Sequence, residues 1–239
     1  MRAPVTGRAA ALAAVLGFAL VPAAAPGQVG YPPTASPYRD LVFRQELTAF
    51  AGYVSGSKGR AGVAPTGGPA AGIRYEIRIG GPAEFHVRLM RAWTERTVLD
   101  PSQPEATRNL GTRPWPIYQG EVGITMNLTG QKSWRQLVPV LSGGIGLASD
   151  ANKGGDPAGF TIGTPFAFSF GAGVRWVPGG SFQLRADISN FLYSVDYPDA
   201  YFGNVATPTV PPILPARSSQ GEWLHNRVLT IGASYLFFR

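Results

Sequence analysis

The chain has few side chains of the kind that carry out acid–base or metal chemistry. It has two histidines and no cysteine, which leaves too few nitrogen and sulfur ligands for a zinc site. His225 follows Glu222 by three residues in the segment EWLHNR, and a histidine beside a carboxylate could act as a base in a lipid hydrolase. Neither His225 nor His86 lies in a nucleophile motif, and GxSxG is absent. We therefore predict a protein that is not an enzyme and needs no cofactor or metal, with lipid chemistry at His225 as an alternative.

Charged side chains instead alternate with apolar ones along short segments. The clearest case is GIRYEIRIG, residues 72–80, where isoleucines and a tyrosine alternate with two arginines and a glutamate. A strand, with its period of two, separates these residues onto opposite faces, whereas a helix does not. The alternation predicts a polar inner face that carries Glu46, Arg74, Glu76, Arg78, Glu84, Arg88, Glu121, Arg175, Arg185 and Asp187. We expect these groups, the lumen charge network, to pair with one another because an unpaired buried charge is costly.

Eight segments show such alternation, and their connections alternate between short and long. The segments are residues 43–56, 72–80, 83–93, 117–130, 134–149, 165–177, 181–193 and 228–239. Tight turns are predicted near 80–82, 130–133 and 178–181, and long loops at 57–71, 97–114, 150–164 and 194–221. Long loops at one end and tight turns at the other are typical of outer-membrane barrels. Residues 43–239 are thus predicted to be all-β, an eight-stranded antiparallel up-and-down transmembrane β-barrel. Ten strands, with a pair from 28–42 and 194–221, are the alternative that the prolines of TPTVPPILP disfavour.

Large aromatic residues fall at the ends of the predicted strands, as the aromatic girdles of a membrane barrel require. The predicted membrane-interface aromatics are Tyr53, Trp93, Trp115, Tyr118, Trp134, Trp176, Tyr193, Trp223, Tyr235 and Phe237. Arg91 falls on the lipid-facing side in strict alternation. Its side chain either reaches the lipid headgroups, or a β-bulge turns it inward.

The first residues predict export from the cytoplasm. Residues 1–27 combine a basic start, the apolar run AAALAAVLGFALV and small residues suited to cleavage, which together are typical of a signal peptide. Residues 28–42 contain three prolines and no periodicity, and we predict a periplasmic linker outside the fold. No later segment approaches the roughly 20 apolar residues of a membrane helix. No basic run suggests nucleic acid. The expected location is the bacterial outer membrane.

The closing segment VLTIGASYLFFR would be an aggregation-prone edge unless it pairs with the first strand and faces lipid. With PVLSGGIGL, FSFGAGVRW and FQLRADIS, residues 43–239 resemble the small eight-stranded OmpA-like and opacity-type outer-membrane barrels. Residues 228–238 resemble their C-terminal assembly signal, with Phe237 as the aromatic residue in register. The resemblance implies outer-membrane lipid and the barrel-assembly machinery as partners.

The predicted role is structural or surface-interacting, because side chains can fill an eight-stranded barrel. The alternative is a narrow porin-like channel for small solutes. In loop 194–221 we expect Tyr197, Tyr201 and Phe202 to be exposed for contact with an extracellular protein or glycan. Ordering of this loop against the barrel rim is the alternative.

Overall fold

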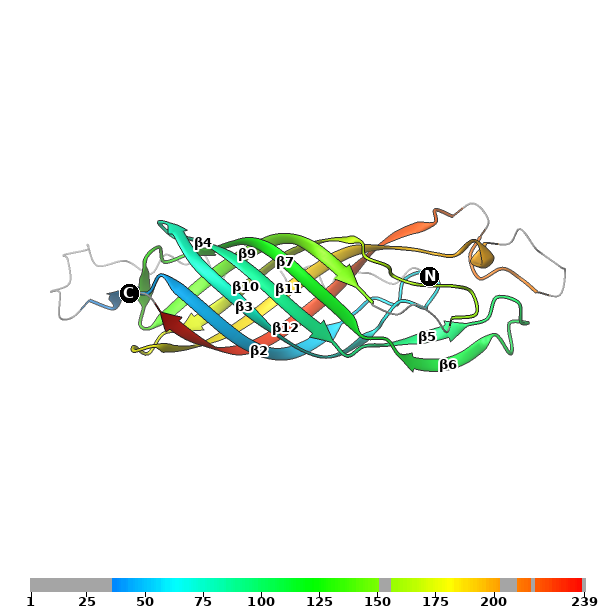
Figure 1. Cartoon of the computed structure of the whole chain (residues 1–239), viewed down its shortest axis with the longest axis horizontal. Coiled ribbons are helices and arrows are strands. Elements are labelled where there is room, and N and C mark those ends of the chain that lie inside the picture. Colours follow the sequence, from blue (N-terminus) through cyan, green and yellow to red (C-terminus); the bar gives the residue numbers. More distant parts are fainter. Residues whose placement is uncertain (1–35, 151–155, 203–209, 216–217, 238–239) are drawn as a thin grey trace, which may run out of the picture. The chain divides into compact units, whose positions relative to one another are not determined.

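A computed structural model describes residues 36–150, 156–202, 210–215 and 218–237 (Figure 1). The predicted signal peptide, residues 1–27, lies outside these ranges, as do the first eight residues of the predicted linker. No helix among the described residues is long and apolar enough to cross a membrane.

Eight strands form a closed antiparallel barrel, which confirms the predicted fold. Its strands are β2 (Gln45–Ser55), β3 (Gly67–Gly80), β4 (Ala83–Ala92), β7 (Ile117–Asn127), β9 (Leu137–Ser149), β10 (Phe166–Trp176), β11 (Phe182–Asp196) and β12 (Gly221–Phe237). Each pairs with the next along the chain, and β12 pairs with β2 to close the barrel. The closing strand therefore has a partner on each side, as the alternation in residues 228–239 predicts.

The register of the pairs shows how strongly the strands are staggered. A row of paired residues that starts at Gln45 on β2 passes through Ile77, Phe85, Ile124, Gly143, Phe170, Asn190 and Arg227. It returns to β2 at Ser55, ten residues further along that strand. Such a stagger requires the strands to tilt relative to the barrel axis, as they do in Figure 1. The stagger thereby sets which residues of distant strands face one another across the lumen.

The connections alternate as predicted, but two of them contain extra strands. The long connection between β4 and β7 holds a hairpin of β5 (Glu95–Leu99) and β6 (Asn109–Pro114). At the opposite end, β8 (Lys132–Trp134) pairs with β1 (Tyr38–Asp40). The connection between β11 and β12 includes the short 3-10 helix η1 (Asp199–Tyr201). The end with the long connections is called the loop end below, and the other the turn end.

Side chains on the barrel strands separate into an apolar outer face and a mixed inner face. Along β12, Leu229, Ile231 and Tyr235 are at least half exposed, whereas Val228, Thr230 and Ser234 are buried. An apolar surface that completely surrounds a barrel is stable only in a lipid environment. The fold therefore fixes which residues meet the membrane and which fill the lumen.

Candidate functional site in the barrel lumen

Three glutamates from neighbouring strands converge on one arginine in the lumen. Glu46 on β2 lies directly opposite Glu76 on β3, and Glu84 on β4 completes the set. One carboxylate oxygen from each of the three lies within 4.8 Å of those from the other two. Arg175 on β10 reaches across the barrel to all three, with nitrogen–oxygen distances of 3.6, 3.0 and 2.6 Å. All four side chains are buried. A carboxylate cluster of this kind could hold a cation, but here the guanidinium of Arg175 supplies the positive charge.

A second arginine extends this cluster along the β10–β11 pair. Arg185 lies directly opposite Arg175 in the register and ion-pairs with Glu76, while its Nε lies 2.6 Å from Asp187. Arg74 pairs with the other oxygen of Glu76 at 3.1 Å. Carboxylates thus separate three guanidiniums that would otherwise repel one another.

His86 belongs to a smaller group of polar side chains on β4 and β7. Its Nε2 lies 3.2 Å from Glu121, whose same oxygen lies 2.8 Å from Nε of Arg88. On the other side of the ring, Nδ1 lies 3.1 Å from Thr125 and 3.0 Å from Arg74. Gly123 makes room for this ring, since a Cβ there would stand 2.8 Å from His86 Cε1. His86 is fully buried and engaged at both nitrogens, so it fills the lumen instead of facing a substrate.

Apolar side chains close the turn end of the lumen. Leu41, Phe43, Val138, Val140 and Leu236 form a buried cluster, the turn-end plug. Residues 38–42, which the sequence analysis assigns to a linker outside the fold, instead contribute β1 and Leu41 to this end. Arg78 also contacts the turn-end plug. Its Nη1 donates to the carbonyl of Leu41 at 3.0 Å, and its guanidinium lies over the ring of Phe43. It is half-buried, and its described contacts differ from those of the other predicted network residues.

A larger apolar cluster, the loop-end plug, closes the other end. Its buried members are Ala61, Val63, Ala64, Trp115, Ile117, Ala148, Phe160, Ile162, Ala167, Tyr193, Val195, Tyr197, Tyr201, Leu214 and Leu224. The plug holds the buried cation Arg96 on β5, which pairs with Asp156 and has its guanidinium over the rings of Trp115 and Phe160. The sequence analysis missed Arg96, although the alternation of Arg96 and Val98 against Glu95, Thr97 and Leu99 was available to indicate an inner face.

Four aromatic residues lie in the loop-end plug, where the sequence predictions did not place them. Trp115 and Tyr193 do not face lipid, because they point into the barrel mouth and are 5% and 0% exposed. Trp115 Nε1 donates to Asp150 at 3.1 Å, which satisfies its polar group inside the plug. Tyr197 and Tyr201, predicted to be exposed in loop 194–221, are buried as well, and Phe202 packs against them. The described part of this loop therefore packs against the barrel rim, in agreement with the alternative prediction.

The other predicted interface aromatics lie on the outer face near its two ends. Tyr53, Trp93, Tyr118 and Trp223 are exposed toward the loop end, and Trp134, Trp176 and Tyr235 toward the turn end. Phe237 is half-buried and its ring lies 6.2 Å from that of Tyr235. Arg91 stays on the outer face without a bulge, with its guanidinium over Trp93 and Tyr118 at 5.1 and 5.3 Å.

His225 and Glu222 do not form the pair that the sequence allows. Glu222 accepts a hydrogen bond from the hydroxyl of Tyr197 at 2.5 Å and pairs with Arg60 at the loop end. His225 is exposed on the outer face, where its Nδ1 lies 3.2 Å from Nδ2 of Asn190. The two positions are three residues apart along β12, an odd spacing that puts their side chains on opposite faces.

Comparison with known proteins finds the same fold without a close relative. No protein-family model and no curated protein sequence matches this chain significantly. Among solved structures, Neisserial surface protein A matches with a TM-score of 0.50 at 14% identity, over 81% of this chain and 97% of that protein. The outer membrane protein OprG from Pseudomonas aeruginosa gives 0.47 at 9% identity, over 82% and 98%. Ail, the attachment invasion locus protein of Yersinia pestis, gives 0.36 at 14% identity, over 81% and 99%.

These identities are low enough that the likeness shows the fold alone, and it does not single out the OmpA-like or opacity-type barrels. Together with the apolar belt on the outer face, that fold identifies the chain as a small eight-stranded β-barrel of the bacterial outer membrane.

Proposed function

We propose that this outer-membrane barrel does not conduct and acts as a structural and surface-interaction protein through its extracellular loops. The filled interior is the observation that carries the proposal. From the turn end inward, the lumen holds the turn-end plug, the charge network, a middle cluster around Phe50, Met90 and Phe191, and the loop-end plug. Each of these levels is built from buried side chains that contact one another across the barrel.

Ion conductance separates this proposal from its rival, a narrow porin-like channel. The purified chain in a planar lipid bilayer should show no current above that of the protein-free bilayer. Steady ion-selective openings that change in the Arg185→Ala or Glu121→Ala variant would mean that the charge network lines a path for ions. Heat-modifiable gel mobility confirms that each variant is folded in the same preparation.

The β5–β6 hairpin is the loop surface best placed to meet an extracellular protein or glycan. All six residues of β6 are exposed, and the edge of β6 away from β5 has no strand partner among the described residues. Such an edge can accept an extended segment of a partner protein. If replacement of residues 101–107 by a Gly-Ser turn leaves binding to host-surface preparations unchanged, the hairpin is not the contact.

We further propose that the chain is not an enzyme and that the resemblance to OmpA-like and opacity-type barrels reflects a similar role. The separation of His225 from Glu222 supports the first point, since no described carboxylate orients the histidine. Release of fatty acid from lipid substrates by the wild type but not by His225→Ala would contradict it.

A further inference from the structure

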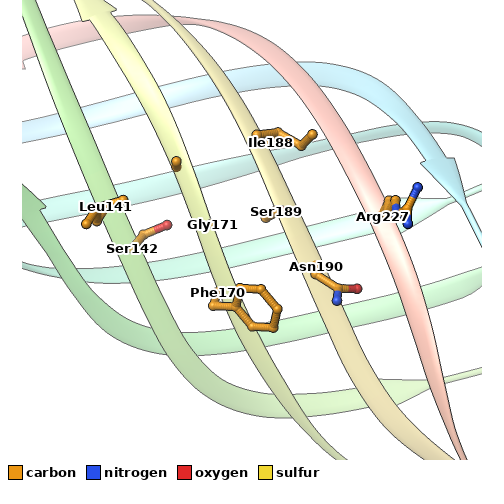
Figure 2. A pocket seen from close by; sticks show the side chains of 9 residues that line it. Leu141, Ser142, Phe170, Gly171, Ile188, Ser189, Asn190 and Arg227 are labelled. Carbon is orange, nitrogen blue, oxygen red and sulfur yellow. The ribbon is translucent and has the colours of Figure 1, made fainter. Parts of the chain in front are cut away.

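The outer wall of the barrel carries a hollow that the filled lumen does not explain. It lies across β9, β10, β11 and β12 and has a volume of about 580 Å³ (Figure 2). Its floor consists of small residues, among them Ser142, Gly171 and Ala172, and larger side chains such as Phe170 and Ile188 border it. An apolar hollow of this kind on a membrane-facing wall is open to the acyl chains of the surrounding lipid.

Two polar side chains border the hollow toward the loop end. Arg227 on β12 and Asn190 on β11 lie directly opposite each other in the register and both line the hollow. Every outward-facing residue of β12 from Leu229 to Tyr235 is apolar, so Arg227 is the first charge met along this strand from the turn end. Four residues further on, the exposed Trp223 marks the aromatic level of the membrane boundary. Arg227 thus stands where lipid headgroups begin.

Neither polar side chain is fully engaged within the part of the chain that the structure describes. Arg227 has no ion pair or ring contact there. The side-chain oxygen of Asn190 is buried and lacks a hydrogen-bond partner, while its nitrogen lies 3.2 Å from His225. A buried polar atom without a partner is costly, which favours a ligand that brings a hydrogen-bond donor to this point.

A second arginine on the outer face provides a contrast. Arg91 also borders a hollow, of about 630 Å³, near the loop end. Its guanidinium, however, already lies over the rings of Trp93 and Tyr118. Of Arg91 and Arg227, Arg227 is therefore the one whose charge is available to a ligand.

We propose that this hollow is a binding site for an anionic, hydroxyl-bearing phospholipid of the surrounding membrane. One acyl chain lies over Gly171 and Ala172, the guanidinium of Arg227 binds the phosphate, and a headgroup hydroxyl donates to the free oxygen of Asn190. Arginine suits phosphate because its planar guanidinium offers two parallel donors. The apolar hollow below the charge matches the amphipathic form of a lipid, which a soluble anion lacks.

Lipid retention measured by native mass spectrometry tests the site. The full chain is released from micelles that contain equal amounts of phosphatidylglycerol and phosphatidylcholine, after heat-modifiable gel mobility has shown that each variant is folded. The wild type should retain phosphatidylglycerol in preference to phosphatidylcholine. Arg227→Gln should weaken phosphatidylglycerol binding about tenfold, and Asn190→Leu should reduce the preference. Ala172→Leu, which fills the hollow without changing charge, should weaken the binding of both lipids.

Arg91→Gln is the matched control, because it removes the same charge from the same face of the barrel near the same end. It should retain phosphatidylglycerol as the wild type does. The proposal is overturned if Arg227→Gln binds as tightly as the wild type, or if Arg91→Gln loses as much affinity. Equal retention of both lipids by the wild type, or a dimer that masks the hollow with a second copy of the chain, would overturn it too.

Discussion

Among single residues, Arg175 has the most demanding position in the barrel. It is fully buried and contacts three glutamates that come from three different strands. Buried ion pairs contribute little net stability compared with apolar packing, but removal of one partner leaves the others uncompensated. The arrangement therefore fixes how β10 faces β2, β3 and β4 across the lumen.

Arg175→Met should destabilise the folded barrel by about 3–5 kcal/mol, because three carboxylates lose their shared cation at similar side-chain volume. The measurement is urea-induced unfolding in detergent micelles, followed by tryptophan fluorescence. Arg91→Met is the control, since its charge lies outside the lumen, and a smaller effect is expected there. A loss below about 1 kcal/mol at Arg175, typical of exposed pairs, would show that the network is solvated.

Tyr197 gives the loop-end plug a measurable response to pH. Burial, followed by its hydrogen bond to the carboxylate of Glu222, raises the pKa of Tyr197 to about 12 from the ordinary value of 10. A raised pKa in the folded state means that this tyrosine stabilises the plug fully below pH 10, and the contribution is lost as pH rises through 12.

The change in absorbance at 295 nm on ionisation measures this directly. In wild-type protein, some tyrosine ionisation should be delayed to about pH 12, and Tyr197→Phe should remove one tyrosine from that late phase. Denatured protein is the control, because its tyrosines should ionise near pH 10. If Tyr197→Phe instead reduces the absorbance change near pH 10, Tyr197 is solvated in the folded protein.

For secondary-structure elements, the sequence predicts the strands more reliably than what lies between them. Period-two alternation identified all eight barrel strands, because each has one face in lipid and one in the lumen. The same alternation indicated which charges face inward, but not that Arg175 meets Glu46, Glu76 and Glu84. Those contacts depend on the stagger of the closed barrel, which no single strand encodes.

The sequence predictions that are wrong concern residues at the barrel ends. There the alternation of apolar and polar residues no longer separates lipid-facing from lumen-facing side chains. Trp115 and Tyr193 lie at strand ends as interface residues do, yet their side chains point inward and are buried in the loop-end plug. The hairpin β5–β6 extends beyond the membrane level, so its strands lack the apolar outer face that marked the others. Residues 38–42 fall in the predicted linker because they show no period of their own, yet they form β1 and part of the turn-end plug.

The closing strand β12 should be required for membrane insertion. Tyr235→Asp with Phe237→Asp places two charges on the outer face near the turn end, which we expect to cost about 1–2 kcal/mol in total and to damage the predicted assembly signal in residues 228–238. The measurement is the yield of heat-modifiable protein in isolated outer membranes.

The pair Leu110→Asp and Thr112→Asp is the matched control for this variant. It adds the same two charges to the exposed strand β6, outside the barrel wall, and should insert normally. Normal outer-membrane yield of the Tyr235→Asp/Phe237→Asp variant would contradict the assigned role of β12.

For the barrel as a whole, the occluding levels lie in series along one axis. An ion that crosses the lumen must pass the turn-end plug, the charge network, the middle cluster and the loop-end plug, and each is made of buried side chains. Resistances in series add, so the most tightly closed level determines the current. Opening one end should therefore have no effect on conductance by itself.

The double variant Leu41→Gly/Phe43→Gly removes the two side chains that the N-terminal segment contributes to the turn-end plug. In a planar bilayer it should give no more current than the wild type, because the charge network, the middle cluster and the loop-end plug still block the path. Adding Arg185→Ala, Phe191→Gly and Trp115→Gly loosens the charge network, the middle cluster and the loop-end plug, and only this combined variant should give openings. Thermal melting in micelles checks that each variant still forms a barrel. Steady current from the turn-end variant alone would mean that the turn-end plug is the only tight level, and that the rest of the lumen is a gated path for ions.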